Sequence, residues 1–194
     1  MTARQWTRAI GAAAVMIGVF TGSVAAFDLT PAVQAELDKQ KAIVAAWAAD
    51  PVLIAAVKEQ NLKGPLPGVD NAKWKSIRRS DPIVQAMVKS PAGLYLKKQI
   101  EAGGGALDKA FLSAAHGEKV AFAEKTISYI HKGQEKFDAP MATGKPWQMA
   151  KAWFDESLQG YAIQVAAPVM DGEKPIGVIV VSVPAAHLEK VAKK

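Results

Sequence analysis

The most informative part of the sequence is residues 161–183, which read YAIQVAAPVMDGEKPIGVIVVSV. Two mainly apolar runs, Tyr161–Val169 and Pro175–Val183, flank the pair Asp171-Gly172. The runs are rich in the β-branched residues that strands favour. Asp-Gly supplies the positive φ angles that a tight hairpin turn requires. The sequence therefore predicts a hairpin of two antiparallel strands near the C-terminus.

Three further strands are predicted ahead of the hairpin, at 109–115, at 120–123 and around Trp153. His116-Gly117 provides a turn between the first two, and residues 157–160 provide one before the hairpin. Residues 126–148 contain several glycines and prolines and are predicted to form a short helix and a loop. This pattern is typical of a small antiparallel sheet with an insertion after its second strand.

The residues before the sheet have helical periodicity. Val33, Leu37, Val44 and Trp47 recur at helical spacing within a predicted long helix over 31–57, which Asp50-Pro51 interrupts. Further helices are expected to start at Asp81-Pro82 and to run from Pro91 to Glu101, where a triple glycine follows. We expect a helical region over 27–105, then a sheet and a C-terminal helix over 106–194, in one domain.

The N-terminus has the features of a secretory signal. Arg4 and Arg8 precede an apolar stretch over 9–20, and small residues follow at 23–26. We predict a cleavable signal peptide over 1–26 and a periplasmic or otherwise secreted product. An uncleaved N-terminal anchor is the alternative.

The composition excludes several classes of site. The chain has no cysteine, so thiolate metal sites and cysteine nucleophiles are excluded. His116, His131 and His187 are far apart in sequence and predict no metal site. The formal net charge is +6, but the lysines are scattered, so we expect no nucleic-acid partner. No catalytic motif is present, and we expect neither an enzyme nor a bound cofactor.

Residues 154–157, Tyr161–Val169 and 171–178 together resemble the final strands of the exported Cache or PDC sensor domains, which are PAS-like. Lys125-Thr126, Tyr129, Gly133 and residues 135–137 resemble the loop of that family between the second strand and the pocket helix. The resemblance is to stand-alone exported members. It implies an α+β fold with a five-stranded antiparallel sheet, a long N-terminal helix, further helices on the N-terminal side and a small-molecule pocket on one face of the sheet.

Such a pocket would lie between the sheet and residues 125–147, and the polar or aromatic side chains there are its expected lining. Strand alternation places Gln164 on the same face as Ala162 and Ala166, which leaves room for a ligand. Each residue also has a simpler explanation: a solvent-facing glutamine, a surface lysine, or aromatic side chains packed in the core. The predicted ligand-binding residues are Lys125, Ser128, Tyr129, Trp147, Trp153 and Gln164.

We therefore expect an extracytoplasmic module that senses or binds a small molecule, an organic acid or an amino acid, without an output domain of its own. Its signal would pass to a partner such as a membrane receptor or a kinase. An alternative is a periplasmic adaptor that docks on a membrane receptor through its helical region. The apolar stripe of the first helix could also form a homodimer seam.

Overall fold

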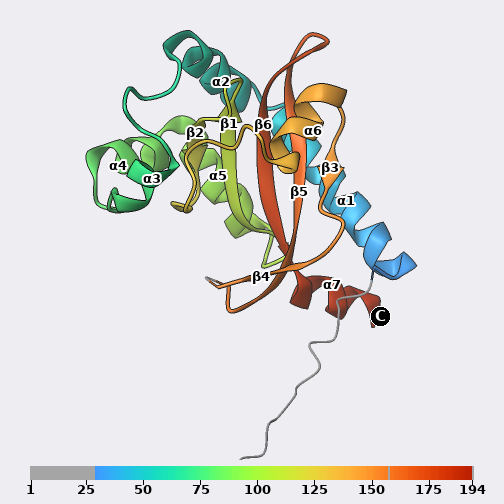
Figure 1. Cartoon of the computed structure of the whole chain (residues 1–194). Coiled ribbons are helices and arrows are strands. Elements are labelled where there is room, and N and C mark those ends of the chain that lie inside the picture. The colour runs from blue at the N-terminus through green and yellow to red at the C-terminus, as the bar shows by residue number, and fades with distance from the viewer. Residues whose placement is uncertain (1–28, 157, 194) are drawn as a thin grey trace, which may run out of the picture.

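The computed structural model describes residues 29–156 and 158–193 (Figure 1). The predicted signal peptide over 1–26 lies outside the described residues. Two helices open the described chain, α1 (Pro31–Ala48) and α2 (Pro51–Lys63). The amide of Val33 donates to Thr30 Oγ1 at 3.3 Å, and the amide of Val52 donates to Asp50 Oδ1 at 2.8 Å. The predicted interruption at Asp50-Pro51 is a bend of 64° between the two helices.

Three shorter helices follow, α3 (Asn71–Ser76), α4 (Pro82–Lys89) and α5 (Pro91–Ala102). Asp81 and Ser90 cap α4 and α5 by accepting from main-chain amides of the first turn. The two predicted helices in this region are confirmed. Helix α3 was not predicted, because its six residues are too few to display a periodic pattern.

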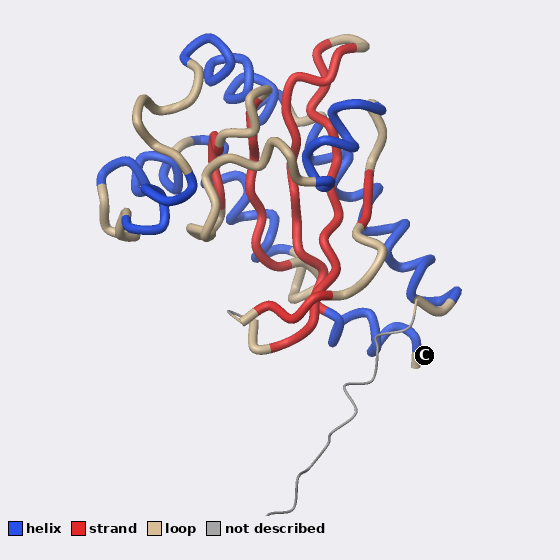
Figure 2. Tube along the Cα trace, viewed as in Figure 1, coloured by secondary structure: helices blue, strands red, loops and turns tan. Residues whose placement is uncertain are grey.

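The sheet is antiparallel and six-stranded, in the order β2-β1-β6-β5-β3, with β4 also paired to β5 (Figure 2). Its strands are β1 (Asp108–Ala114), β2 (Lys119–Phe122), β3 (Trp147–Gln148), β4 (Trp153–Asp155), β5 (Gly160–Asp171) and β6 (Lys174–Pro184). All five predicted strands are present. The additional strand, β3, has only two residues and lies within the stretch predicted as helix and loop.

The predicted hairpin is the centre of the sheet. Strands β5 and β6 pair from Ala162 opposite Pro184 to Asp171 opposite Lys174, and Gly172 in the turn has a φ of 60°. Gly177 of β6 lies against a neighbouring strand and helix. A Cβ at this position would lie 2.4 Å from the carbonyl oxygen of Ser113 and 2.8 Å from Val57 Cγ1. Glycine at 177 therefore permits the close approach of β1 and α2 to β6.

Helices and loops cover both faces of the sheet. The face packed by α1, α2, α5 and α7 (Ala185–Ala192) carries the larger apolar cluster, which includes Leu37, Leu53 and Leu112. The opposite face carries Phe111, Phe122 and Val180, and it is covered by α3, by residues 125–131 and by α6 (Glu135–Thr143). In Figure 1, α6 lies in front of β5 and β6, and α1 lies behind them.

The apolar stripe of α1 packs inside the molecule. Val33, Leu37, Val44 and Trp47 are buried in the larger cluster against the sheet. The stripe proposed as a homodimer seam is therefore occupied by the chain's own sheet. Among the described residues, no single helix is long and apolar enough to cross a membrane, although α1 and α2 together, as a bent pair, pass that test of length and composition.

Candidate functional site

A β-bulge between β1 and β2 places Lys119 in the interior. Leu112 pairs with Ala121, whereas the next residue, Ser113, pairs with Lys119, so Val120 is the extra residue. Lys119 and Phe122 consequently share a face of the sheet, although their spacing of three would place them on opposite faces of a regular strand. The Lys119 side chain is fully buried.

The amine of Lys119 has polar and aromatic neighbours. Its Nζ donates to the carbonyl oxygen of Ser128 at 2.7 Å and to the hydroxyl of Thr126. It also lies 4.5 Å from the ring centroid of Phe111 and 5.7 Å from that of Phe122. A lysine amine in such a position is held by hydrogen bonds and by ring faces, without a counter-charge.

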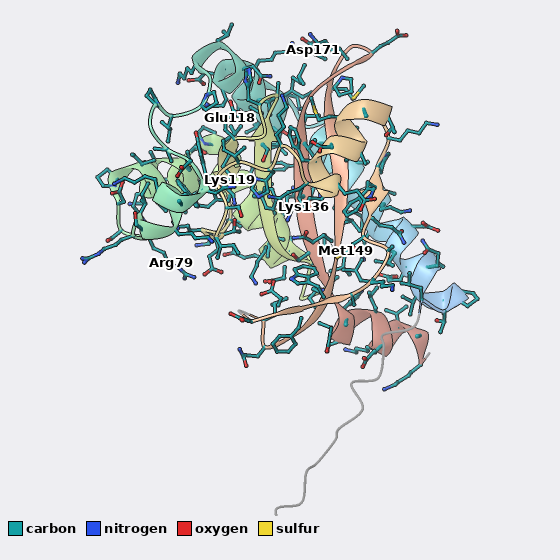
Figure 3. All side chains as sticks on the ribbon, in the orientation of Figure 1. Arg79, Glu118, Lys119, Lys136, Met149 and Asp171 are labelled. Atoms are coloured by element: carbon teal, nitrogen blue, oxygen red, sulfur yellow. The ribbon has the colours of Figure 1, made fainter. Side chains whose placement is uncertain are left out.

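A second lysine approaches the same ring from α6. The Nζ atom of Lys136 lies 5.7 Å from the Phe111 centroid and donates to Gln164 Oε1 at 3.1 Å. Figure 3 shows both lysines in front of the sheet, Lys119 on the side of β2 and Lys136 beside α6. Two cations that are distant in sequence thus meet over one phenylalanine.

His131 completes the group. Its ring stacks on Phe111 with a centroid distance of 4.3 Å, and its Nδ1 is buried without a hydrogen-bond partner in the described part of the chain. Ser113, the cross-strand neighbour of Lys119, also has a buried hydroxyl without a partner there. We call Phe111, Lys119, His131, Lys136 and Gln164 the cation site. Unpaired buried polar atoms are uncommon in folded proteins and call for an explanation such as a missing ligand or water.

The electrostatics of the cation site are strongly unbalanced. Burial, and then the neighbouring Lys136 and Lys125, lower the pKa of Lys119 well below its ordinary value. Burial also lowers the pKa of Lys136. Burial, with Lys119 and Lys136 as further causes, lowers the pKa of His131 to about 2. These shifts all disfavour positive charge.

No carboxylate offsets this charge within the described residues. None of the ion pairs there involves Lys119 or Lys136. The acidic neighbour in sequence, Glu118, accepts from the main-chain amide of His116 at 3.1 Å. An anion beside these amines would supply the negative charge that the described residues do not.

Helix α3 holds the segment that covers the cation site. Asn71 Oδ1 accepts from the amides of Tyr129 and Ile130 at 2.7 and 2.8 Å, and its Nδ2 donates to the carbonyl of Ile130 at 3.0 Å. The indole of Trp74 donates to the carbonyl of Thr126 at 2.8 Å. Residues 126–130 are thus fixed in front of the sheet by two side chains of a short helix.

The structure brings three of the predicted site residues to the sheet face of the cation site. Gln164 contacts Lys136 directly. Trp147 pairs in register with Ala166, packs against the aromatic cluster and donates from Nε1 to Glu135 Oε1 at 3.3 Å. Trp153 pairs with Ala162, which lies two residues from Gln164 on the same face.

The other three predicted residues belong to the covering segment. Tyr129 is fully buried, stacks on Trp74 and accepts from the amide of Leu66 at 2.9 Å, so it packs in the core. Lys125 donates to the carbonyl of Trp74 at 3.1 Å and lies over its ring, and thus points towards α3. Ser128 contacts Lys119 through its main-chain carbonyl.

Lys119, Lys136 and Phe111 were not predicted as site residues. Lys136 stands among the residues that carry the family resemblance, where it is part of a loop motif. Phe111 looked like an ordinary strand residue, and Lys119 preceded the predicted strand at 120–123. No metal site accompanies them, since the described residues hold no group of three or more histidine, cysteine or acidic side chains that could bind an ion.

The antiparallel sheet with helices on both of its faces is an arrangement that a solved structure shares. The sensor domain of the histidine kinase DctB from V. cholerae has this fold, with a TM-score of 0.55 and 18% identity over 84% of this chain and 54% of that chain. The fold is that of the Cache or PDC sensor domains, as the sequence predicted. The chain spans a little over half the length of the DctB domain.

Chemoreceptor domains are similar at lower scores. The ligand-binding domain of the amino-acid chemoreceptor PctC from Pseudomonas aeruginosa PAO1, in complex with GABA, has a TM-score of 0.47 and 12% identity over 82% of this chain and 58% of that chain. The sensory domain of Campylobacter jejuni Tlp3 with isoleucine bound has a TM-score of 0.45 and 14% identity, over 86% of this chain and 69% of that chain. No protein-family model and no curated protein matches the sequence.

Proposed function

We propose that residues 27–194 form an extracytoplasmic, non-enzymatic sensing domain that binds a small organic anion at the cation site. The observation that carries this proposal is the meeting of two lysine amines within 6 Å of the Phe111 centroid, with no acidic partner among the described residues. A ligand carboxylate would accept from both amines. The sensor-domain fold supports a sensing role, and the predicted signal peptide supports the location.

The charge of the cation site favours an organic acid over an amino acid. The ammonium group of an amino acid needs an anionic or carbonyl partner, and a third cation beside Lys119 and Lys136 would add repulsion. A carboxylate instead forms short, charge-assisted hydrogen bonds with lysine amines. A dicarboxylate could use both lysines at once. The interior polar partners, Gln164 Oε1 and the Ser128 carbonyl, are already occupied by the two lysines.

Three ligands of similar length test the preference. Butyrate, succinate and GABA each have one carboxylate on a short chain that ends in a methyl, a second carboxylate or an ammonium group. We expect succinate to raise the melting temperature most, butyrate less and GABA least, because a ligand that binds only the folded state stabilises it by mass action. Titration calorimetry on the same protein gives the affinities.

Lysine substitutions locate the binding. Lys119→Met and Lys136→Met are expected to weaken succinate binding by at least about tenfold each, since each removes a charged hydrogen bond of roughly 1.5–3 kcal/mol. Lys132→Met is the matched control, because Lys132 is exposed and lies four residues before Lys136. Binding that survives both site substitutions, or stronger binding of GABA than of succinate, would contradict the proposal.

We also propose a signalling partner, a membrane receptor or a kinase, that reads the helical region. Leu62 of α2 is 90% exposed, which makes it a position at which a contact of the helical region can be tested. Crosslinking in envelope extracts tests this proposal. Leu62→Asp is expected to reduce a specific crosslinked product, whereas Lys63→Asp should leave it in place.

A further inference from the structure

A basic hollow lies at the surface beside the segment that covers the cation site. Its volume is about 220 Å³. Three cationic side chains and no acidic one contribute to its lining, although Arg79 also pairs with Glu124 nearby. The lining residues are Lys75, Ile77, Arg79, Lys125, Thr126 and Ile127. The hollow is thus suited to attract small anions from solution.

Thr126 connects this hollow with the cation site. It lines the hollow, and its hydroxyl accepts a hydrogen bond from the fully buried amine of Lys119. The neighbouring side chain, Ile127, is 75% exposed, whereas the main chain of the segment is held to α3 by Asn71 and Trp74. In Figure 3, Arg79 lies near the edge of the molecule and Lys119 lies further in, towards the sheet.

We propose that the basic hollow is the entrance through which a small anion reaches Lys119, and that Thr126 is the gate. This inference rests on the proposed function of the cation site. Lys75, Arg79 and Lys125 concentrate the anion in the hollow. The Thr126 hydroxyl then releases the Lys119 amine, and a carboxylate oxygen of the ligand takes its place. The exchange conserves the number of hydrogen bonds at Lys119.

A second hollow on the same side of the molecule provides a control. Its volume is about 560 Å³, and Lys73 and Arg78 contribute to its lining together with Asp81. None of the residues of the cation site lines it. Ile77 lines both hollows, but Thr126, which accepts from Lys119, lines only the first of these two.

The test of the entrance is the association rate of succinate, followed by stopped-flow tryptophan fluorescence. Trp74 bonds to the Thr126 carbonyl and is positioned to report the exchange. We expect Lys75→Gln with Arg79→Gln to slow association about five- to tenfold at low salt, with the dissociation rate unchanged. The difference should vanish near about 1 M salt, where charges are screened within about 3 Å. Lys73→Gln with Arg78→Gln removes the same charge and should have a much smaller effect.

The test of the gate is Thr126→Val, which keeps the side-chain shape and removes the hydroxyl. We expect association to become several-fold faster with dissociation unchanged, because the closed state loses the bond that competes with the ligand. Thr126→Ser should behave like the wild type.

The outcomes separate the two proposals. The entrance proposal is contradicted if both pairs of lysine and arginine substitutions slow association equally. It is also contradicted if Thr126→Val speeds dissociation and leaves association unchanged. In either case the proposed binding function still stands. Failure of the wild-type protein to bind succinate or butyrate overturns the proposed function, and the entrance with it.

Discussion

The buried imidazole of His131 should make the protein sensitive to acid. Its pKa is about 2 in the folded protein against 6.5 for the free side chain. Below pH 6.5 the unfolded chain therefore binds a proton that the folded chain does not. The free energy of unfolding consequently decreases as the pH is lowered. The loss between pH 7 and pH 5 is about 2 kcal/mol for this group.

Urea unfolding at both pH values measures this loss. His131→Phe retains a ring that can stack on Phe111. This substitution should reduce the dependence of the free energy of unfolding on pH. His116→Asn replaces an exposed histidine outside the cation site and is the comparison variant. An equally steep dependence in His131→Phe would show that other groups cause the acid sensitivity.

Lys119 should lower the stability of the free protein. A buried amine without a carboxylate partner loses its hydration and is incompletely repaid by two hydrogen bonds. We expect Lys119→Met to raise the free energy of unfolding by about 1–3 kcal/mol at neutral pH, measured by urea denaturation, while it weakens anion binding. Lys132→Met should change stability by less than about 0.5 kcal/mol. A less stable Lys119→Met protein would mean that the amine's hydrogen bonds outweigh its desolvation.

At the scale of elements, Gly177 fixes the approach of β1 and α2 to β6. Gly177→Ala places a Cβ at 2.4 Å from a main-chain oxygen, which cannot move aside as a flexible side chain would. We expect this substitution to lower the free energy of unfolding by about 2–3 kcal/mol, measured by thermal or urea denaturation. Gly160→Ala is the control within β5, because its Cβ would meet only the Leu158 carbonyl at 3.7 Å. Equal effects of the two substitutions would contradict this account.

The sequence predicted the elements that have strong local signals. Asp171-Gly172 and the apolar runs around it specified the hairpin, and the two Asp-Pro pairs specified helix starts. Strand β3 escaped prediction because the pairing of Trp147 with Ala166 is a tertiary contact. The cation site escaped because the bulge at Val120 reverses the face of Lys119, and nothing in the local sequence marks that extra residue.

At the scale of the whole molecule, burial of the α1 stripe predicts that this stripe forms no dimer seam. Leu37 is fully buried against the sheet of its own chain. Leu37→Ala should therefore cost about 2–5 kcal/mol in the free energy of unfolding and leave the molar mass from light scattering unchanged. Lys39→Ala on the exposed side of the same helix should affect neither quantity strongly. A wild-type dimer that dissociates on the Leu37 substitution would contradict this prediction.

With no carboxylate beside Lys119 among the described residues, the proposed anion binding would be coupled to the acidity of the surroundings. Burial and two neighbouring cations hold the pKa of this amine well below its ordinary value, and an anion bound beside it would raise that pKa again by favouring the protonated form. Calorimetric titrations of succinate in buffers of different ionisation enthalpy should show net proton uptake, and apparent affinity should weaken as the pH rises. Uptake of the anion and of the proton would then be one combined event, strongest where an organic acid has acidified the surroundings.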